Sequence, residues 1–130
     1  MLFAILLTSF HFAFTSYIRI QPPMIEPAYG SDSTSIEDLS LPGGPTGHVN
    51  IRIIRPVEPA DSPPVIMYFH GGGWALGNKY TYDRLIREVA NKTNAAVVFV
   101  EYSLSPGVRY PVAIEEAYHA MEYVANNGKQ

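Results

Sequence analysis

The sequence has no cysteine among its 130 residues, so disulfide bonds, thiol nucleophiles and thiolate metal sites are excluded. Its four histidines, at positions 11, 48, 70 and 119, lie far apart and do not show the short spacing that metal sites require. We therefore expect no bound metal. Basic residues are also few: nine lysines and arginines stand against 12 acidic residues, and they form no patch. A nucleic-acid partner is not expected from this charge pattern.

What is present is apolar. Hydrophobic residues make up 47% of the chain and charged residues 16%, which favours a globular protein with a core over a disordered one. The length of 130 residues is that of a single domain. Eleven prolines, most of them in the first half, interrupt the chain with loops.

No charged side chain precedes Arg19, and three interpretations of this apolar start remain open. A packed or amphipathic helix is the first. A membrane anchor is the second, although the run is slightly shorter than the roughly 20 apolar residues that a span requires. A cleaved signal is the third, although no basic residue comes before the apolar run. Membrane association through residues 1–20 is therefore one expectation. The sequence leaves the location open, with the cytoplasm and the membrane as the two places expected.

Three strands are predicted after a connector rich in proline, glycine and serine, which carries one further short strand at Ser35–Leu39. Val49, Ile51 and Ile53 alternate with polar residues, which predicts a strand buried on one face. The apolar runs at 65–69 and 95–100 have no such alternation and predict strands buried on both faces, as in a parallel sheet.

Two helices are predicted from apolar residues at helical spacing. The first covers Tyr80–Thr93, with Thr81 as N-cap and Asp83 facing solvent. The second follows Pro111, and its predicted apolar face contains Ala113, Ile114, Ala117, Tyr118, Met121 and Val124. Residues 65–100 then form a β-α-β unit, and ligand sites in such units lie at the carboxyl ends of the strands.

The feature at the carboxyl end of the first strand of that unit is His70-Gly71-Gly72-Gly73-Trp74. Three glycines leave backbone N–H groups bare and closely approachable, as an oxyanion hole or an anion cradle requires. A flexible turn is the alternative explanation. The three glycines alone do not decide between them.

This stretch resembles the HGGG oxyanion motif of the hormone-sensitive-lipase-like branch of the α/β-hydrolases. A second block supports the resemblance: residues 101–106 and 110–117 are similar to the D-Y-R-L-A-P-E segment of that branch and its F-P-A-A-x-E-D-A helix start. Two positions depart from the pattern, since Ser103 replaces the usual Arg and Gly107 the usual Glu. The two blocks occur in the family's order, separated by one predicted helix and one predicted strand.

The resemblance implies an α/β fold, namely the amino-terminal part of an α/β-hydrolase with a mostly parallel sheet and flanking helices. We divide the chain into residues 1–47, an apolar segment with its connector, and residues 48–130, a partial α/β-hydrolase domain. The implied function is that of a serine carboxylesterase or lipase-type hydrolase acting on small-molecule or lipid esters. No cofactor is implied.

The nucleophile signature G-x-S-x-G occurs nowhere in the 130 residues. In the family the catalytic Ser, acid and His come in that order and after the two blocks found here. We therefore expect the chain to be inactive alone. The alternatives are a non-catalytic ligand-binding protein on the same fold and a truncated product without function.

The site residues carried over by the resemblance lie in the glycine loop. Gly72 and Gly73 are the expected oxyanion donors, and Gly71 is the third member of the loop. His70 is expected to orient the loop by hydrogen bonds rather than to act as the base, because the family's base comes last in the chain.

Other residues are less tightly specified. Trp74 and Leu76 either line the mouth of an acyl pocket or pack, and these two interpretations stay open. Tyr102 is expected to anchor its loop, and His119 to lie on a solvated helix face. Glu116 is interpreted, with its neighbour, as a charge at the start of a helix.

Overall fold

The computed structural model describes residues 34–59 and 61–128. The apolar start of the sequence, with its three interpretations, lies outside these described residues. Within the described part, no helix has the length and apolar character needed to cross a membrane.

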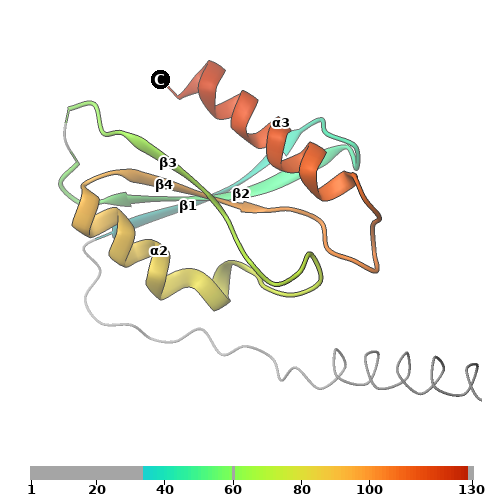
Figure 1. Cartoon of the computed structure of the whole chain (residues 1–130). Helices are drawn as coiled ribbons and strands as arrows, with labels where there is room; N and C mark the ends of the chain where they lie inside the picture. Colours follow the sequence, from blue (N-terminus) through green and yellow to red (C-terminus); the bar gives the residue numbers. More distant parts are fainter. Residues whose placement is uncertain (1–33, 60, 129–130) are drawn as a thin grey trace, which may run out of the picture.

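A four-stranded sheet organises the described residues (Figure 1). The elements in chain order are β1 (Thr34–Pro42), β2 (His48–Pro56), β3 (Val65–Phe69), α2 (Lys79–Thr93), β4 (Ala96–Glu101) and α3 (Val112–Asn127). The spatial order of the strands is β1-β2-β4-β3. Strands β3 and β4 are parallel and joined by α2, which confirms the expected β-α-β unit, whereas the β1–β2 and β2–β4 pairs are antiparallel. The α/β fold class is confirmed, and the described sheet is mixed rather than mostly parallel.

Strand β1 is longer than the short strand expected at Ser35–Leu39. It lies within the segment assigned to the connector, and all nine of its residues pair with β2. The division of the chain at residue 47 stays a prediction.

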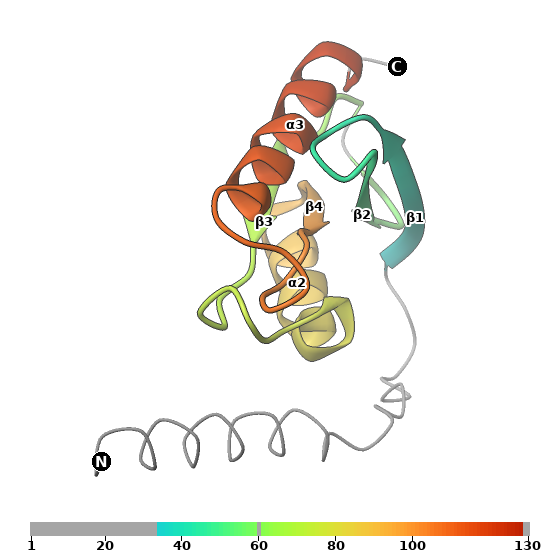
Figure 2. The same cartoon turned by 90° about the vertical axis from the view of Figure 1, so that its right-hand side faces the viewer.

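The two helices cover opposite faces of the sheet, as the two views in Figures 1 and 2 show. Strand β4 supplies both cores by alternation, since Val97 and Phe99 face α2 whereas Val98 and Val100 face α3. The core on the α2 side consists of Ile54, Ile86, Ala90, Val97 and Phe99. The core on the α3 side consists of Leu41, Val49, Ile51, Val98, Val100, Tyr102 and Ala120.

The prediction that β2 is buried on one face only was wrong. Arg52, expected in solvent, is 6% exposed beneath α2. Burial of this charge is possible because Asp38 and Asp83 both contact its guanidinium, and a buried charge needs such partners. The face of β2 that carries Arg52 is therefore covered by α2, and the arginine is buried there in ion pairs.

Strand β3 was predicted to be buried on both faces, and this was also wrong for its ends. Among the described strands it pairs only with β4, and Phe69 is 44% exposed. The reason is the strand order. Strand β4 lies between β2 and β3, so β3 is at the edge of the described sheet and has a neighbouring strand on one side only.

Asn78, not Thr81, caps helix α2. The Oδ1 atom of Asn78 accepts the backbone N–H groups of Tyr80 and Thr81, at 3.0 Å each. Asp83 was expected in solvent and is instead buried, because it pairs with Arg52 under the helix. At the other end Asn94 adopts the left-handed conformation, φ 51°, which asparagine tolerates at a helix exit.

Helix α3 rests on the sheet through a narrower stripe than predicted. Ala120 and Glu116 are buried, and Ala113 and Val124 pack against the same core, giving a spacing of three to four residues. The rest of the predicted apolar face does not point at the sheet, and Ile114, Tyr118 and Met121 are exposed. The exposed fraction of Tyr118 is 59%.

Candidate active site

The glycine loop follows β3 directly and folds back on itself. The carbonyl of Gly72 accepts the backbone N–H groups of Ala75 and Leu76, at 3.2 and 3.0 Å. Gly72 has φ +128°, and a Cβ there would come within 2.0 Å of the Leu76 carbonyl oxygen, so only glycine fits. The N–H groups of Gly72 and Gly73 have no acceptor within the described part of the chain. The loop therefore presents two adjacent donors that the described fold leaves available.

His70 is held in an aromatic stack at the base of this loop. Its ring lies parallel to Tyr102 at 4.3 Å between centroids and parallel to Phe99 at 5.3 Å. The Nδ1 atom lies 2.8 Å from the Gly71 carbonyl oxygen. Gly77 passes so close that a Cβ there would meet Nδ1 at 2.6 Å. These contacts support the expected role of His70, which is to orient the loop.

Two tyrosine hydroxyls hold the backbone of the same loop. Tyr102 donates to the His70 carbonyl, and Tyr82 of α2 donates to the Gly71 carbonyl at 3.1 Å. Burial raises the pKa of Tyr102, which keeps its hydroxyl protonated and able to donate. Helical spacing places Tyr82 on the apolar face of the helix, and such spacing cannot distinguish a packing ring from a ring that also donates a hydrogen bond.

The second loop, residues 103–111, is anchored by a carboxylate that sequence reasoning missed. Glu116 is 1% exposed and accepts from the Ser103 backbone N–H at 2.6 Å and from the Ser103 Oγ at 3.0 Å. Thr46 donates to the same carboxylate from the turn between β1 and β2. The interpretation of Glu116 as a helix-start charge is therefore corrected. Its helical spacing from Ala113 and Ala120, which face the sheet, is the sequence feature that could have indicated its burial.

The two loops meet through a hydrogen bond from the Ser105 backbone N–H to the Trp74 carbonyl, 2.8 Å long. A hollow of about 350 Å³ lies between them, lined by Gly73, Trp74, Ser103, Ser105, Val108, Arg109, Tyr110, Pro111, Ala113 and Ile114. A second hollow of about 370 Å³ is lined by Phe69, His70, Gly71, Gly73, Trp74, Tyr102, Ala113, Ile114 and Ala117.

The predicted site residues differ in which of the two hollows they line. Gly73 and Trp74 line both hollows, whereas His70 and Gly71 line only the second. Gly72 and Leu76 line neither, and the Leu76 carbonyl instead closes against Gly72. The structure therefore brings His70, Gly71, Gly73 and Trp74 together around one space and leaves Gly72 and Leu76 outside it.

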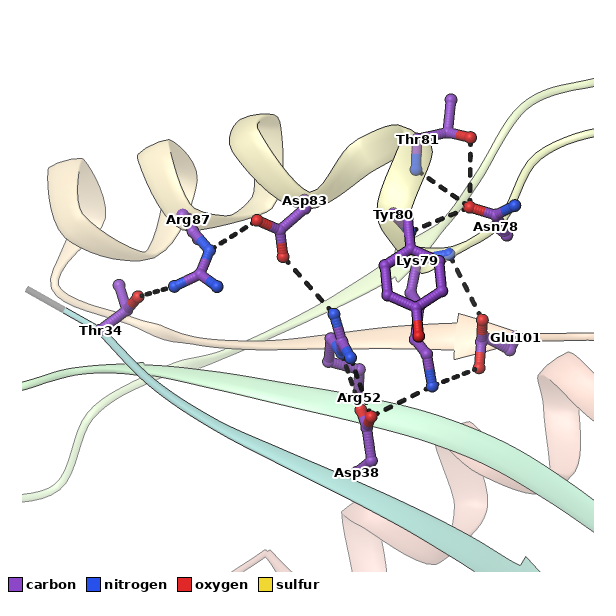
Figure 3. A network of polar contacts seen from close by, with 10 residues as sticks. All are labelled: Thr34, Asp38, Arg52, Asn78, Lys79, Tyr80, Thr81, Asp83, Arg87 and Glu101. Carbon is purple, nitrogen blue, oxygen red and sulfur yellow. Dashed lines mark hydrogen bonds and ion pairs between the residues drawn. The ribbon is translucent and has the colours of Figure 1, made fainter. Parts of the chain in front are cut away.

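A polar network fixes the end of the glycine loop to three strands (Figure 3). Lys79 begins α2 immediately after the loop, and its Nζ lies 3.1 Å from Asp38 and 3.3 Å from Glu101. Arg52 contacts the same Asp38 at 2.7 Å. The hydrogen bond from Arg52 is the main cause that lowers the pKa of Asp38 to about 2, and Lys79 lowers it further.

No group of three or more His, Asp or Glu side chains in the described ranges is placed to hold a metal ion. The chemistry that the described site offers is therefore that of backbone N–H donors beside a largely apolar hollow. Such donors suit an oxygen atom on which negative charge develops.

Comparisons with known proteins agree with this geometry. A family model described as alpha/beta hydrolase fold matches residues 66–130. The chain is 41% identical over 97 residues to the esterase LipI of Mycobacterium tuberculosis, covering 73% of this chain and 30% of that protein. It is 41% identical over 86 residues to an acetyl esterase of Salmonella schwarzengrund, covering 66% of this chain and 26% of that protein.

Solved structures show the same likeness in three dimensions. Carboxyl esterase 2 from Tuber melanosporum superposes with a TM-score of 0.72 at 38% identity, over 90% of this chain and 41% of that one. The chain thus spans less than half the length of each of these relatives. It belongs to the alpha/beta hydrolase family, in the hormone-sensitive-lipase-like esterase branch that its two sequence blocks resemble.

Proposed function

We propose that this chain carries the oxyanion-binding half of a serine carboxylesterase site, which acts on small-molecule or lipid esters of carboxylic acids. The observation that carries the proposal is the pair of N–H groups of Gly72 and Gly73, which have no acceptor among the described residues. Gly73 also lines the hollow in which an ester would lie. The names of the relatives, which are esterases, support the same class of substrate.

In the proposed reaction a serine attacks the ester carbonyl, and the acyl group is transferred to the serine as the ester's C–O bond breaks and the alcohol leaves. Water then attacks the acyl-serine, which releases the carboxylic acid and restores the serine hydroxyl. The carbonyl oxygen becomes negatively charged in the tetrahedral intermediate, and Gly72 and Gly73 donate to it. Removal of one such donor lowers the rate on the order of 10²–10³ in serine hydrolases. Gly71 and His70 keep the donors in place through the contacts with Tyr82 and Tyr102.

The serine, acid and base of that reaction are not identified in this sequence, because G-x-S-x-G is absent. We therefore predict that the 130-residue chain does not hydrolyse p-nitrophenyl acetate in a serine-dependent manner. Turnover that a serine-directed sulfonyl fluoride abolishes would contradict this prediction.

A second candidate function is non-catalytic ligand binding on the same fold. It is favoured by the two hollows, which the described residues form without a serine in a G-x-S-x-G motif. A truncated product without function is the third alternative. A sharp cooperative unfolding transition of the monomer would count against that third alternative.

The enzymatic proposal can be tested by a segment exchange. The stretch of the Salmonella acetyl esterase that matches this chain is replaced by the corresponding residues from this chain, and hydrolysis of p-nitrophenyl acetate is measured. We expect the chimera to keep activity, because the donors and their supports are transferred together. A chimera that unfolds cooperatively but does not hydrolyse the ester would refute the enzymatic proposal, and ester binding by that chimera would support the binding function.

A further inference from the structure

Arg109 is the charged side chain in the wall of the hollow between the glycine loop and the 103–111 loop. The other lining residues are apolar, aromatic, serine or glycine. A single cation in an otherwise uncharged wall gives the hollow a preference for one sign of ligand charge. Because a guanidinium carries its charge at every physiological pH, this preference does not depend on titration.

Within the described ranges, Arg109 has no carboxylate partner and its side chain makes no hydrogen bond. The other described arginines are all paired: Arg52 with Asp38, Arg55 with Glu37, Arg84 with Glu88, and Arg87 with Asp83. Arg109 is thus the arginine of the described chain whose donors are available to an external anion.

The carboxylates nearest to Arg109 in sequence do not compete for this place. Glu116 is buried and its oxygens accept from Ser103 and Thr46. Glu115 does not line the hollow. The first turn of α3 does line it, through Ala113 and Ile114, and the amino end of a helix carries partial positive charge. That first turn also holds Glu115, which offsets the partial charge, so Arg109 is the group in the wall that favours an anion.

Two large aromatic surfaces open onto the same space. Trp74 is 59% exposed and Tyr110 is 86% exposed, and both line the hollow. Aromatic rings of this kind pack against the apolar body of a ligand while its polar end binds elsewhere. A ligand that uses all these features has an apolar body and an anionic end.

We propose that Arg109 makes this hollow selective for esters that carry a carboxylate, such as the half-esters of dicarboxylic acids. Arg109 would bind the carboxylate through paired N–H donors, the geometry that guanidinium and carboxylate share. Trp74 and Tyr110 would contact the apolar body, and the ester carbonyl would lie toward Gly73. This inference rests on the proposed function, because it names the substrate class of that same site.

The test uses the fluorescence of Trp74, the single tryptophan of the chain, which lies in the wall of the hollow. The 130-residue chain is titrated with monobenzyl succinate and, separately, with its neutral match, benzyl methyl succinate. We expect the anionic probe to bind about tenfold more tightly, which corresponds to about 1.4 kcal/mol. The preference should weaken as salt is added, because Arg109 is accessible to solvent.

Substitutions test whether Arg109 causes the preference for the anionic probe. Arg109→Gln should bring the two probes to equal affinity, and Arg109→Lys should keep part of the difference. Arg55→Gln removes the same charge from β2, outside the hollow, and should leave the preference unchanged. Far-ultraviolet circular dichroism of each variant checks that the fold is retained.

Three results would overturn the inference: equal affinity for the two probes, a preference that survives Arg109→Gln, or no binding of either probe. The result is separable from the proposed function. A hydrolytic chimera whose chain shows no charge preference overturns the inference about Arg109 only. An inactive chimera whose chain still prefers the anion overturns the enzymatic proposal and leaves an anion-selective binding protein.

Discussion

Gly72 shows how closely the loop conformation depends on a single residue type. Its φ of +128° is open to glycine, and its α-carbon faces the Leu76 carbonyl at a distance that leaves no room for a methyl group. Gly73 also has a positive φ, +63°, but a Cβ there would meet nothing within 4 Å. Neighbouring glycines are therefore required for different reasons, one by packing and backbone conformation and the other by conformation alone.

This difference predicts unequal effects of alanine at the two positions. Gly73→Ala should lower the free energy of unfolding by about 1–2 kcal/mol, the usual cost of a left-handed residue with a side chain. Gly72→Ala should cost more, because the Leu76 carbonyl must move. The same movement should also shift the emission of Trp74, which lies two residues further along the loop. Urea unfolding and the fluorescence of the native state measure the two effects.

Gly47 offers a matched control for backbone strain. It has φ +89°, with nothing within 4 Å of an added Cβ, and it lies in the turn between β1 and β2. Gly47→Ala should resemble Gly73→Ala in stability and leave the Trp74 emission unchanged. If Gly72→Ala proved no more costly than Gly47→Ala, the close approach to Leu76 would not matter to the loop.

At the level of residues, the sequence predicted the glycines that the loop conformation requires. It did not predict the charged residues that the fold buries. The glycine loop was recognised because residues 70–74 and the block at 101–117 both resemble family motifs and occur in the family's order. Glu116 was interpreted as a helix-start charge and Arg52 as a residue on the open face of its strand, because an isolated pattern does not show the partner of a charged residue. Their partners, Ser103 and Asp38, come from other elements, and only the fold brings them together.

Among the elements, α2 holds the key position, since it begins where the glycine loop ends. Its amino end is tied to β1 and β4 through Lys79, which contacts Asp38 and Glu101 (Figure 3). Its second turn is tied to β2 through Asp83 and Arg52. These ion pairs link the loop to the strands on the α2 side of the sheet.

Acidification should loosen this connection in a defined window. The pKa of Asp38 is lowered from 3.8 to about 2, chiefly by its hydrogen bond to Arg52. A carboxyl with a depressed pKa stabilises the folded state above the unfolded value and loses this effect as the pH falls through the folded value. The stability difference between wild type and Asp38→Asn should therefore be full above about pH 5 and shrink progressively as the pH falls through about 2.

Urea unfolding across that pH range measures the difference. Glu122→Gln is the control, because Glu122 is an exposed carboxyl on α3 that forms no ion pair in the described part of the chain. That variant should show no comparable pH-dependent difference. A constant gap between wild type and Asp38→Asn from pH 5 to pH 2 would contradict the assigned role of Asp38.

The approximate positions of the strands and helices followed from local patterns, whereas their environments did not. Apolar runs and helical spacing located every predicted strand and helix that falls within the described residues. The exposure of β3 and the rotation of α3 were not predictable, because both depend on strand order. Spacing cannot show that β4 lies between β2 and β3.

For the described part as a whole, the distribution of exposed apolar side chains is uneven. Phe69 and Val65 on β3 are exposed, as are Ile114, Tyr118 and Met121 on α3. Phe69 and Ile114 line the same hollow, so the exposed residues of the two elements are neighbours there. A contiguous apolar surface beside a strand that pairs on one side promotes association between copies.

We therefore expect the 130-residue chain to self-associate at high concentration and to dissociate on dilution, as measured by sedimentation velocity. Phe69→Lys and Met121→Lys should each reduce association, because a charge in the contact area must be desolvated. Leu85→Lys provides the comparison, since Leu85 is an equally exposed apolar residue on α2, across the sheet from α3. Equal effects of all three substitutions would indicate general solubility, whereas a selective effect of the first two assigns the association to the β3–α3 surface.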